Sequence, residues 1–196
     1  MQKTTINVGL LGFGTIGTGV VKVFQENAEV IRQRTGVELR LTRIADLDLT
    51  TDRGVTLPDG LLTADADAIL TDPDIDIVIE LIGGYKPALQ FVLKAIENGK
   101  HIVTANKALM AVHGQEIIEA ASRANVDVLF EAAVGGGIPV ISAIKENLCA
   151  NRFSTVLGIL NGTCNFILTK MTNEGSDFAP VLAEAQQLGY AETDPT

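Results

Sequence analysis

Residues Asn7–Gly19 read NVGLLGFGTIGTG, and this stretch decides the fold. An apolar run, Val8–Leu11, leads directly into the pattern Gly12-x-Gly14-x-x-Gly17, and a helix-compatible segment follows. Glycines in this order are typical of a dinucleotide-binding turn, where they allow the tight turn, admit the pyrophosphate and let the helix pack on the strand. The helix N-terminus then offers N–H groups to the phosphates. The stretch therefore predicts a nucleotide cofactor site.

The composition limits the class of protein. The chain has 196 residues, of which 46% are hydrophobic and 20% charged, so it can bury a core. Its net charge of −9 argues against a nucleic acid partner, which needs clustered Lys and Arg. We find neither a signal peptide nor the roughly 18 apolar residues of a membrane span. Cys149 and Cys164 form no Cys-x-x-Cys motif and fit a reducing compartment, so we expect a cytoplasmic enzyme.

Strands and helices are expected to alternate through the first two thirds of the chain. The expected strands are Ile6–Leu11, Leu39–Ala45, Ile75–Ile82, His101–Thr104 and Val126–Phe130. The expected helices are Ile16–Arg34, Ala66–Thr71, Pro87–Asn98 and Gly114–Ala124, with a loop at Asp48–Asp65. Apolar strands without polar alternation indicate burial on both faces, hence a parallel sheet. The fold class is therefore α/β, a Rossmann-type parallel sheet with helices on both faces.

The pattern changes after Glu131. We expect a helix at Pro139–Asn147, a strand at Phe153–Leu160 and helices at Asn161–Thr172 and Phe178–Leu188. We divide the chain into an NAD(P)-binding Rossmann domain, residues 1–134, and the truncated start of a second α+β domain, residues 135–196, for which the family resemblance given below implies substrate binding and dimerisation. About 60 residues are a thin basis for an independent core.

Asp46 ends the second expected strand, where a carboxylate can bind the adenosine ribose. It lies further beyond Gly17 than the usual ~20 residues, because the intervening helix is long. No Arg directly follows Asp46, which favours NAD, but Arg43 and Arg53 are near enough to leave NADP open. A solvated loop acid is the alternative interpretation.

Three further segments follow expected strands, at the edge where ligands bind in open α/β sheets: ELIGG at residues 80–84, TANK at 104–107 and EAAVGGG at 131–137. Lys107 is the only basic residue among them. Its ammonium can polarise a carbonyl or orient a hydroxyl during hydride transfer, or it is a surface lysine. The triple glycine can be a hinge, an anion nest or a turn whose carbonyls hold a hard cation.

The motifs VGLLGFGTIG, ELIGG, TANKAL, FEAAVGGGIP, GILNGTCNFIL and LGYAETDP are collinear and cover essentially the whole chain. In these motifs the chain resembles homoserine dehydrogenases. The resemblance implies reversible NAD(P)-dependent interconversion of L-homoserine and L-aspartate 4-semialdehyde, in threonine, methionine and isoleucine biosynthesis.

The resemblance also implies roles for individual residues. Lys107 would lie between nicotinamide and substrate as the catalytic residue, and Glu192 would bind the homoserine amino group, as a carboxylate does well. A sodium ion would be held by the backbone carbonyls of Glu131, Val134, Gly136 and Ile138. With the glycine turn and the strand ends, the expected cofactor-binding set is Gly12, Phe13, Gly14, Thr15, Ile16, Gly17, Asp46, Gly83, Lys107 and Gly189.

The family continues beyond this chain's last motif with a substrate-binding Asp and the Lys taken as proton donor, and this chain ends before both. We therefore expect the chain to bind its cofactor without turnover, and the full-length protein to be a homodimer or homotetramer. The sequence leaves open the NAD or NADP preference and any C-terminal regulatory domain.

Two other classes remain possible at this point. Rossmann oxidoreductases of the glucose–fructose oxidoreductase type usually carry Glu-Lys-Pro where this chain has TANK. The other class is a nucleotide-binding module without catalysis, or the dehydrogenase part of an aspartokinase fusion. We disfavour an N-terminal fusion because the chain starts at the Rossmann strand.

Overall fold

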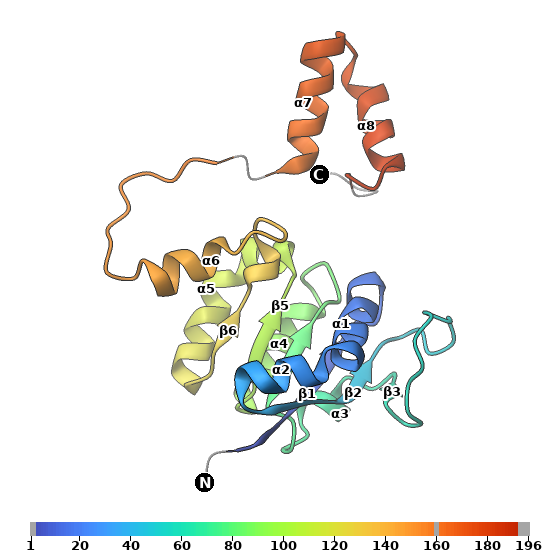
Figure 1. The fold of residues 1–196 in the computed structure, drawn as a ribbon, viewed down its shortest axis with the longest axis vertical. Helices are drawn as coiled ribbons and strands as arrows, with labels where there is room; N and C mark the ends of the chain where they lie inside the picture. The colour runs from blue at the N-terminus through green and yellow to red at the C-terminus, as the bar shows by residue number, and fades with distance from the viewer. Residues whose placement is uncertain (1–2, 159–160, 192–196) are drawn as a thin grey trace. The chain divides into compact units, whose positions relative to one another are not determined.

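The structure is a computed structural model that describes residues 3–158 and 161–191. Contacts between residues divide the chain into two units, Met1–Ala143 and Ile144–Thr196, and each is described by itself (Figure 1). The domain boundary expected after residue 134 remains a prediction. Within the described ranges, no helix is both long and apolar enough to cross a lipid bilayer.

The first unit is built on one parallel sheet. Its strands are β1 (Thr5–Leu11), β2 (Glu38–Ala45), β3 (Leu62–Thr63), β4 (Ile77–Glu80), β5 (His101–Thr104) and β6 (Val128–Leu129). They lie in the order β3-β2-β1-β4-β5-β6, and every neighbouring pair is parallel. After β1 the chain adds β2 and β3 on one side of β1, and it then adds β4, β5 and β6 on the other side. A crevice therefore opens between the carboxyl ends of β1 and β4. The expected Rossmann-type sheet is confirmed.

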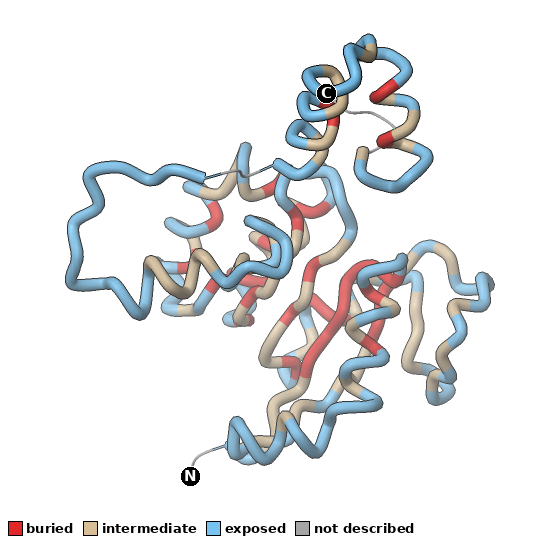
Figure 2. The backbone as a smooth tube through the Cα atoms, turned by 45° about the horizontal axis from the view of Figure 1, so that its top comes forward, coloured by how far each residue is buried: buried red, intermediate tan, exposed pale blue. Residues whose placement is uncertain are grey.

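Helices cover both faces of this sheet (Figure 1). They are α1 (Thr15–Glu26), α2 (Ala28–Thr35), α3 (Asp67–Leu70), α4 (Ala88–Glu97) and α5 (Lys107–Ala124). The unit also contains a short 3₁₀ turn, η1 (Glu131–Ala133), and α6 (Val140–Ser142), and a π turn, η2 (Ala143–Asn147), spans the boundary between the two units. Successive strand residues point to opposite faces. Leu10 accordingly packs in a cluster with Val21 of α1, whereas Leu11 packs with buried residues of α4 and α5. In Figure 2, many of the residues coloured red as buried lie along the central strands of the sheet.

Two expected helices have different limits. The single helix expected at Ile16–Arg34 is wrong, because α1 ends before Asn27 and α2 begins after it. Asparagine competes for backbone hydrogen bonds and disfavours a helix interior. The helix expected from Gly114 begins at Lys107 instead, because the side chain of Asn106 accepts a hydrogen bond from the N–H of Leu109 and caps the helix.

Two strands also differ from expectation. The strand expected at Ile75–Ile82 is confined to β4, whose Val78 is buried while Ile77 and Ile79 are only half-buried. Helix α4 therefore covers one face of β4 fully, and the described residues cover the other face in part. The loop expected at Asp48–Asp65 contains the short strand β3, which pairs with the end of β2.

After η2, the described part of the second unit contains α7 (Gly162–Glu174) and α8 (Phe178–Gln187), which pack around Ile167, Val181 and Ala185. The strand expected at Phe153–Leu160 is wrong over residues 153–158, which are exposed and carry no strand pairing. A strand requires a neighbouring backbone as hydrogen-bond partner, and no described segment supplies one there. Residues 159–160 lie outside the described residues.

Candidate functional site

The glycine turn joins β1 to α1 at the carboxyl edge of the sheet. Gly12 has a φ of 95°, and a Cβ there would lie 2.7 Å from the carbonyl oxygen of Leu81. A Cβ on Gly17 would lie 2.2 Å from the carbonyl oxygen of Gly12, so both positions require glycine. A Cβ on Gly14, in contrast, would meet nothing within 4 Å. The turn is closely packed on the protein side and open beside Gly14.

The first turn of α1 suits an anion. Its N-cap residue, Gly14, has no side chain to cap the helix, and the first turn holds no acidic residue. Thr15 and Ile16 are both exposed, although exposure to water does not stabilise the apolar side chain of isoleucine. The positive end of the helix dipole and the N–H groups at this terminus favour a phosphate group.

Asp46 follows β2 and reaches the glycine turn. Its two carboxylate oxygens accept hydrogen bonds from the N–H of Phe13 at 2.6 Å and from the N–H of Asp48 at 2.8 Å. The guanidinium of Arg53 lies 3.6 Å from the same carboxylate and 4.7 Å from the centre of the buried Phe13 ring. Each carboxylate oxygen has a further lone pair, so Asp46 can still accept a ribose hydroxyl.

A cavity of about 560 Å³ opens beside this carboxylate. It lies between the carboxyl ends of β1, β2 and β4, and its lining is mainly apolar. The lining includes Gly14, Asp46, Leu47, Ile82 and Phe91. Apolar walls with a few placed polar groups are the usual form of a small-molecule site, and here they suit a nucleoside. Leu47 and Phe91 could not be predicted as lining residues from the sequence, because neither belongs to a motif.

A buried polar cluster lies where β4 and β5 end. Glu80 is fully buried and accepts hydrogen bonds from the N–H of Ile82 at 2.9 Å and from the hydroxyl of Thr104 at 2.7 Å. The side-chain amide of Asn106 also donates to Glu80, at 3.3 Å, and to the carbonyl of Gly84, at 2.6 Å. All three side chains belong to motifs visible in the sequence, ELIGG and TANK, but neither motif indicates that they meet.

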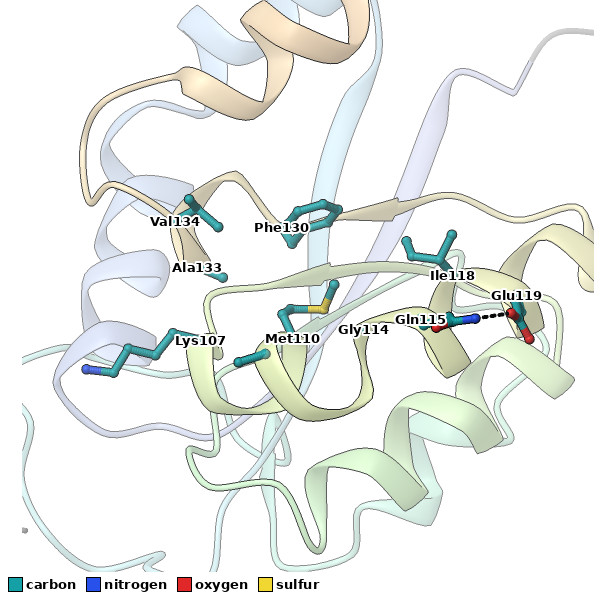
Figure 3. A pocket seen from close by; sticks show the side chains of 10 residues that line it. Lys107, Met110, Gly114, Gln115, Ile118, Glu119, Phe130, Ala133 and Val134 are labelled. Atoms are coloured by element: carbon teal, nitrogen blue, oxygen red, sulfur yellow. Dashed lines mark hydrogen bonds between the residues drawn. The ribbon is translucent and has the colours of Figure 1, made fainter. Parts of the chain in front are cut away.

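Lys107 is the first residue of α5 and is exposed. It lines a second cavity, of about 630 Å³, between α5 and the η1 turn (Figure 3). Apolar side chains form most of the remaining wall, among them Met110, Ile118, Phe130 and Val134. Lys107 thus stands at the start of a helix, beside an apolar hollow, next to the capping residue Asn106.

The glycine-rich segment after η1 turns sharply, with φ values of 73° at Gly135 and 62° at Gly136. The carbonyl of Glu131 accepts the N–H of Val134 at 3.2 Å, and that of Ile138 accepts the N–H of Val140 at 2.8 Å. Each carbonyl oxygen has a second lone pair, which leaves capacity for a cation. Among the described residues no group of acidic, His and Cys side chains could hold a metal, so a cation here would depend on backbone carbonyls.

The side chain of Glu131 has a different use. Its carboxylate accepts hydrogen bonds from the N–H groups of Ser142 at 2.7 Å and Ile141 at 2.8 Å, in α6. These backbone bonds, that of Ser142 first, hold the pKa of the Glu131 carboxyl below its ordinary value. Glu131 therefore ties the η1 turn to the following helix.

The remaining expected site residues fall in separate places. Gly83 follows β4 and has a φ of 81°. Gly189 belongs to the second unit, follows α8 and has a φ of 75°. Glu192 lies outside the described residues. In the first unit, the structure brings the glycine turn, Asp46 and the ends of β4 and β5 to one edge of the sheet.

Comparisons with known proteins agree on one family. Residues 12–131 match the family model "Homoserine dehydrogenase, NAD binding domain", and residues 139–196 match the model "Homoserine dehydrogenase". A curated homoserine dehydrogenase of Synechocystis is 52% identical over 192 residues, which are 98% of this chain and 44% of that protein. The chain therefore spans less than half the length of this relative.

Solved structures give the same result. The crystal structure of a homoserine dehydrogenase from Thiobacillus denitrificans matches all of this chain and 46% of its own, with a TM-score of 0.89 and 52% identity. A hyperthermophilic archaeal homoserine dehydrogenase in complex with NADPH matches 97% of this chain and 63% of its own, with a TM-score of 0.81 and 25% identity.

Proposed function

This chain belongs to the homoserine dehydrogenase family, and we propose that the protein containing it oxidises L-homoserine reversibly to L-aspartate 4-semialdehyde with NAD or NADP. The observation that carries the proposal is the glycine turn, which is open beside Gly14 and lines an apolar cavity together with Asp46. These groups fit the phosphates, ribose and base of a dinucleotide.

The proposed cofactor contacts follow from this arrangement. The N–H groups of the first α1 turn, with Thr15 and Ile16, would meet the pyrophosphate, and Asp46 would accept the adenosine ribose hydroxyls. Gly189 would contact the nicotinamide end, and Gly83 also belongs to the proposed cofactor-binding set. The bound nicotinamide supplies the hydride acceptor or donor.

The chemistry at the substrate is assigned to Lys107. Its ammonium would lie between nicotinamide and substrate, where it would polarise the aldehyde carbonyl or orient the homoserine hydroxyl. Glu192 would bind the substrate ammonium, since opposite charges form strong hydrogen bonds. A sodium ion on the carbonyls of Glu131, Val134, Gly136 and Ile138 completes the proposed site, supported by the positive-φ glycines of that turn.

We further propose a cytoplasmic homodimer or homotetramer. Cys149 and Cys164 are exposed free thiols, which suits a reducing compartment. The residue roles and the assembly state are carried over from the family motifs.

The test is an assay of the whole protein with L-homoserine and either cofactor, followed by the absorbance of NADH or NADPH. We expect turnover that is lost when Lys107 is replaced by Met, with the affinity for the cofactor largely retained. A whole protein that binds NAD(P)H but leaves homoserine unchanged would refute the activity.

A further inference from the structure

The buried carboxylate of Glu80, where β4 ends, contacts both the loop that follows β4 and the cap of α5. We propose that Glu80 is a positioning residue, which acts through Thr104 and Asn106 to fix Lys107 relative to the glycine loop at residues 82–84. The proposal rests on the proposed function, because it assumes that Lys107 meets the substrate.

The carboxylate of Glu80 lies in a buried site that supplies hydrogen-bond donors to both of its oxygens. Its side chain is 0% exposed, yet three donors converge on its two oxygens. One is the backbone N–H of Ile82, and the others are the Thr104 hydroxyl and the Asn106 amide. A carboxylate buried without such partners is strongly destabilising, so the three donors compensate for its removal from water.

The side chain of Asn106 connects Glu80 to two neighbouring segments, the glycine loop and the first turn of α5. Its amide nitrogen donates both to Glu80 and to the carbonyl of Gly84, which ties the glycine loop to the end of β5. Its amide oxygen accepts the N–H of Leu109 at 3.0 Å, which sets the first turn of α5. All the hydrogen-bonding atoms of the Asn106 amide are therefore used, and the side chain has one orientation.

Thr104 stabilises the same junction between the end of β5 and the start of α5. Its hydroxyl donates to Glu80 and accepts the backbone N–H of Asn106 at 3.0 Å. The N–H and the amide of Asn106 are thus both held by way of one carboxylate. Lys107 is the next residue, so the direction in which its side chain leaves the helix depends on this cluster.

Packing alone does not call for a charged group here. Buried ionic groups are often replaced by apolar residues of similar volume with little loss of stability. The Glu80 cluster lies beneath the loop and the lysine, on the far side of β1 from Asp46. We therefore expect it to control the placement of Lys107 and not the binding of the adenosine half of the cofactor.

The experiment compares Glu80→Gln, Thr104→Val and Thr104→Ser in the whole protein. Gln offers one acceptor oxygen where Glu80 offers two, and Val removes the bridging hydroxyl that Ser retains. For Glu80→Gln and Thr104→Val we expect kcat to fall about 10- to 100-fold, as for a misplaced catalytic group, with the NAD(P)H dissociation constant within about twofold of the parent. Thr104→Ser should recover most of kcat.

Folded variants with the parental kcat would overturn the proposal, as would a loss of cofactor affinity as large as the loss of kcat. Amide hydrogen exchange in the whole protein, measured without substrate, tests the geometry independently of activity. We expect Ile82 and Leu109 to exchange faster in Thr104→Val, and Gly12–Gly17 to exchange as in the parent. Inactivity of the parental whole protein with homoserine would refute the proposed function, whereas unchanged exchange at Ile82 and Leu109 would refute the positioning cluster.

Discussion

The carboxylate of Asp46 accepts a hydrogen bond of 2.6 Å from the backbone N–H of Phe13. Phe13 lies between the first two glycines of the turn, so a side chain at the end of β2 holds the backbone at the end of β1. The expected ribose ligand is thus also a support of the phosphate-binding turn. Substitutions at Asp46 will act on both.

Gly14→Val is expected to lower the affinity for NADH by at least about tenfold, which is about 1.4 kcal/mol. A Cβ at Gly14 meets no protein atom within 4 Å, so we expect the variant to fold normally. The valine would instead occupy the space of the pyrophosphate. Fluorescence titration with NADH measures the effect.

Gly19→Val is the matched control, because Gly19 lies in α1 and a Cβ there also meets nothing within 4 Å. It should retain the parental affinity. If Gly14→Val is folded and binds NADH as tightly as the parent, the cofactor is not at this turn.

Asp46→Ala is expected to weaken NAD binding by about 1.5–3 kcal/mol, the usual range for a lost hydrogen bond to a charged group. NADP should lose less, because the substitution also removes the repulsion between the carboxylate and the 2′-phosphate. Arg53, which lies 3.6 Å from Asp46 and 3.3 Å from Asp48, would keep its positive charge beside the site. Calorimetric titration with each cofactor measures the difference.

Asp46→Asn separates charge from shape, since its amide oxygen can still accept the N–H of Phe13. This variant should keep the glycine turn in place and lose the discrimination. Equal losses of NAD and NADP affinity in Asp46→Ala would show that Asp46 does not discriminate.

Glu131 should make stability depend on acidic pH. Hydrogen bonds from Ser142 and Ile141 lower the pKa of Glu131 below its ordinary value of 4.5. The folded state therefore binds its proton less tightly than the unfolded state, and the stabilisation is present above pH 4.5 and lost as the pH falls through the lowered pKa. Thermal unfolding followed from neutral to acidic pH should show a smaller acid-induced decrease in Glu131→Gln. Parallel curves for both proteins would contradict this role.

Lys100 is a buried support at the opposite edge of the sheet. Its side chain, 1% exposed just before β5, donates hydrogen bonds to the carbonyls of Asp72 and of Ile75, the latter at 2.9 Å. Lys100→Met leaves these carbonyls without that donor, so we expect urea unfolding to show a loss of about 1–3 kcal/mol. The affinity for NADH should be unchanged.

Lys94→Met removes an exposed ion pair with Asp67 and is the control. Such pairs contribute about 0–1 kcal/mol. Equal effects of the two lysine substitutions would remove the case for a special role of the buried one.

The 196-residue chain alone is expected to bind NADH without oxidising L-homoserine. It spans 44% of the Synechocystis relative, and catalytic groups that act together lose activity non-additively when some are absent. NADH appearance at alkaline pH, measured beside the whole protein, tests this. Comparable turnover would assign proton transfer to Lys107 itself.

Sequence patterns identified the Rossmann sheet because its signals are local. The Gly12–Gly17 turn and the apolar strands carry them within a few residues each, and the sheet order follows from general rules of chain connection. The residues at which helices begin and end were harder to predict from the sequence. The cap at Asn106 was a readable signal, since asparagine favours that position, but the apolar pattern alone suggested a later start.

The Glu80 cluster could not be read from the sequence. Glu80 and Thr104 are 24 residues apart and meet only because β4 and β5 pair in register. Arg53 lies in a segment with little regular structure, so its position above Phe13 depends on the folded loop. Side chains from different elements pair only in the folded protein, and such pairing produces no periodic pattern in the sequence.

The sheet order separates two properties that could otherwise constrain each other's evolution. Asp46 and Arg53 follow β2 on one side of β1, whereas Glu80 ends β4 and Asn106 follows β5 on its other side. Given the roles proposed for Asp46 and Lys107, a lineage can exchange one coenzyme for the other through substitutions on the β2 side while the residues around Lys107 are inherited unchanged. Under those roles, coenzyme choice is the trait that this architecture leaves free to diverge.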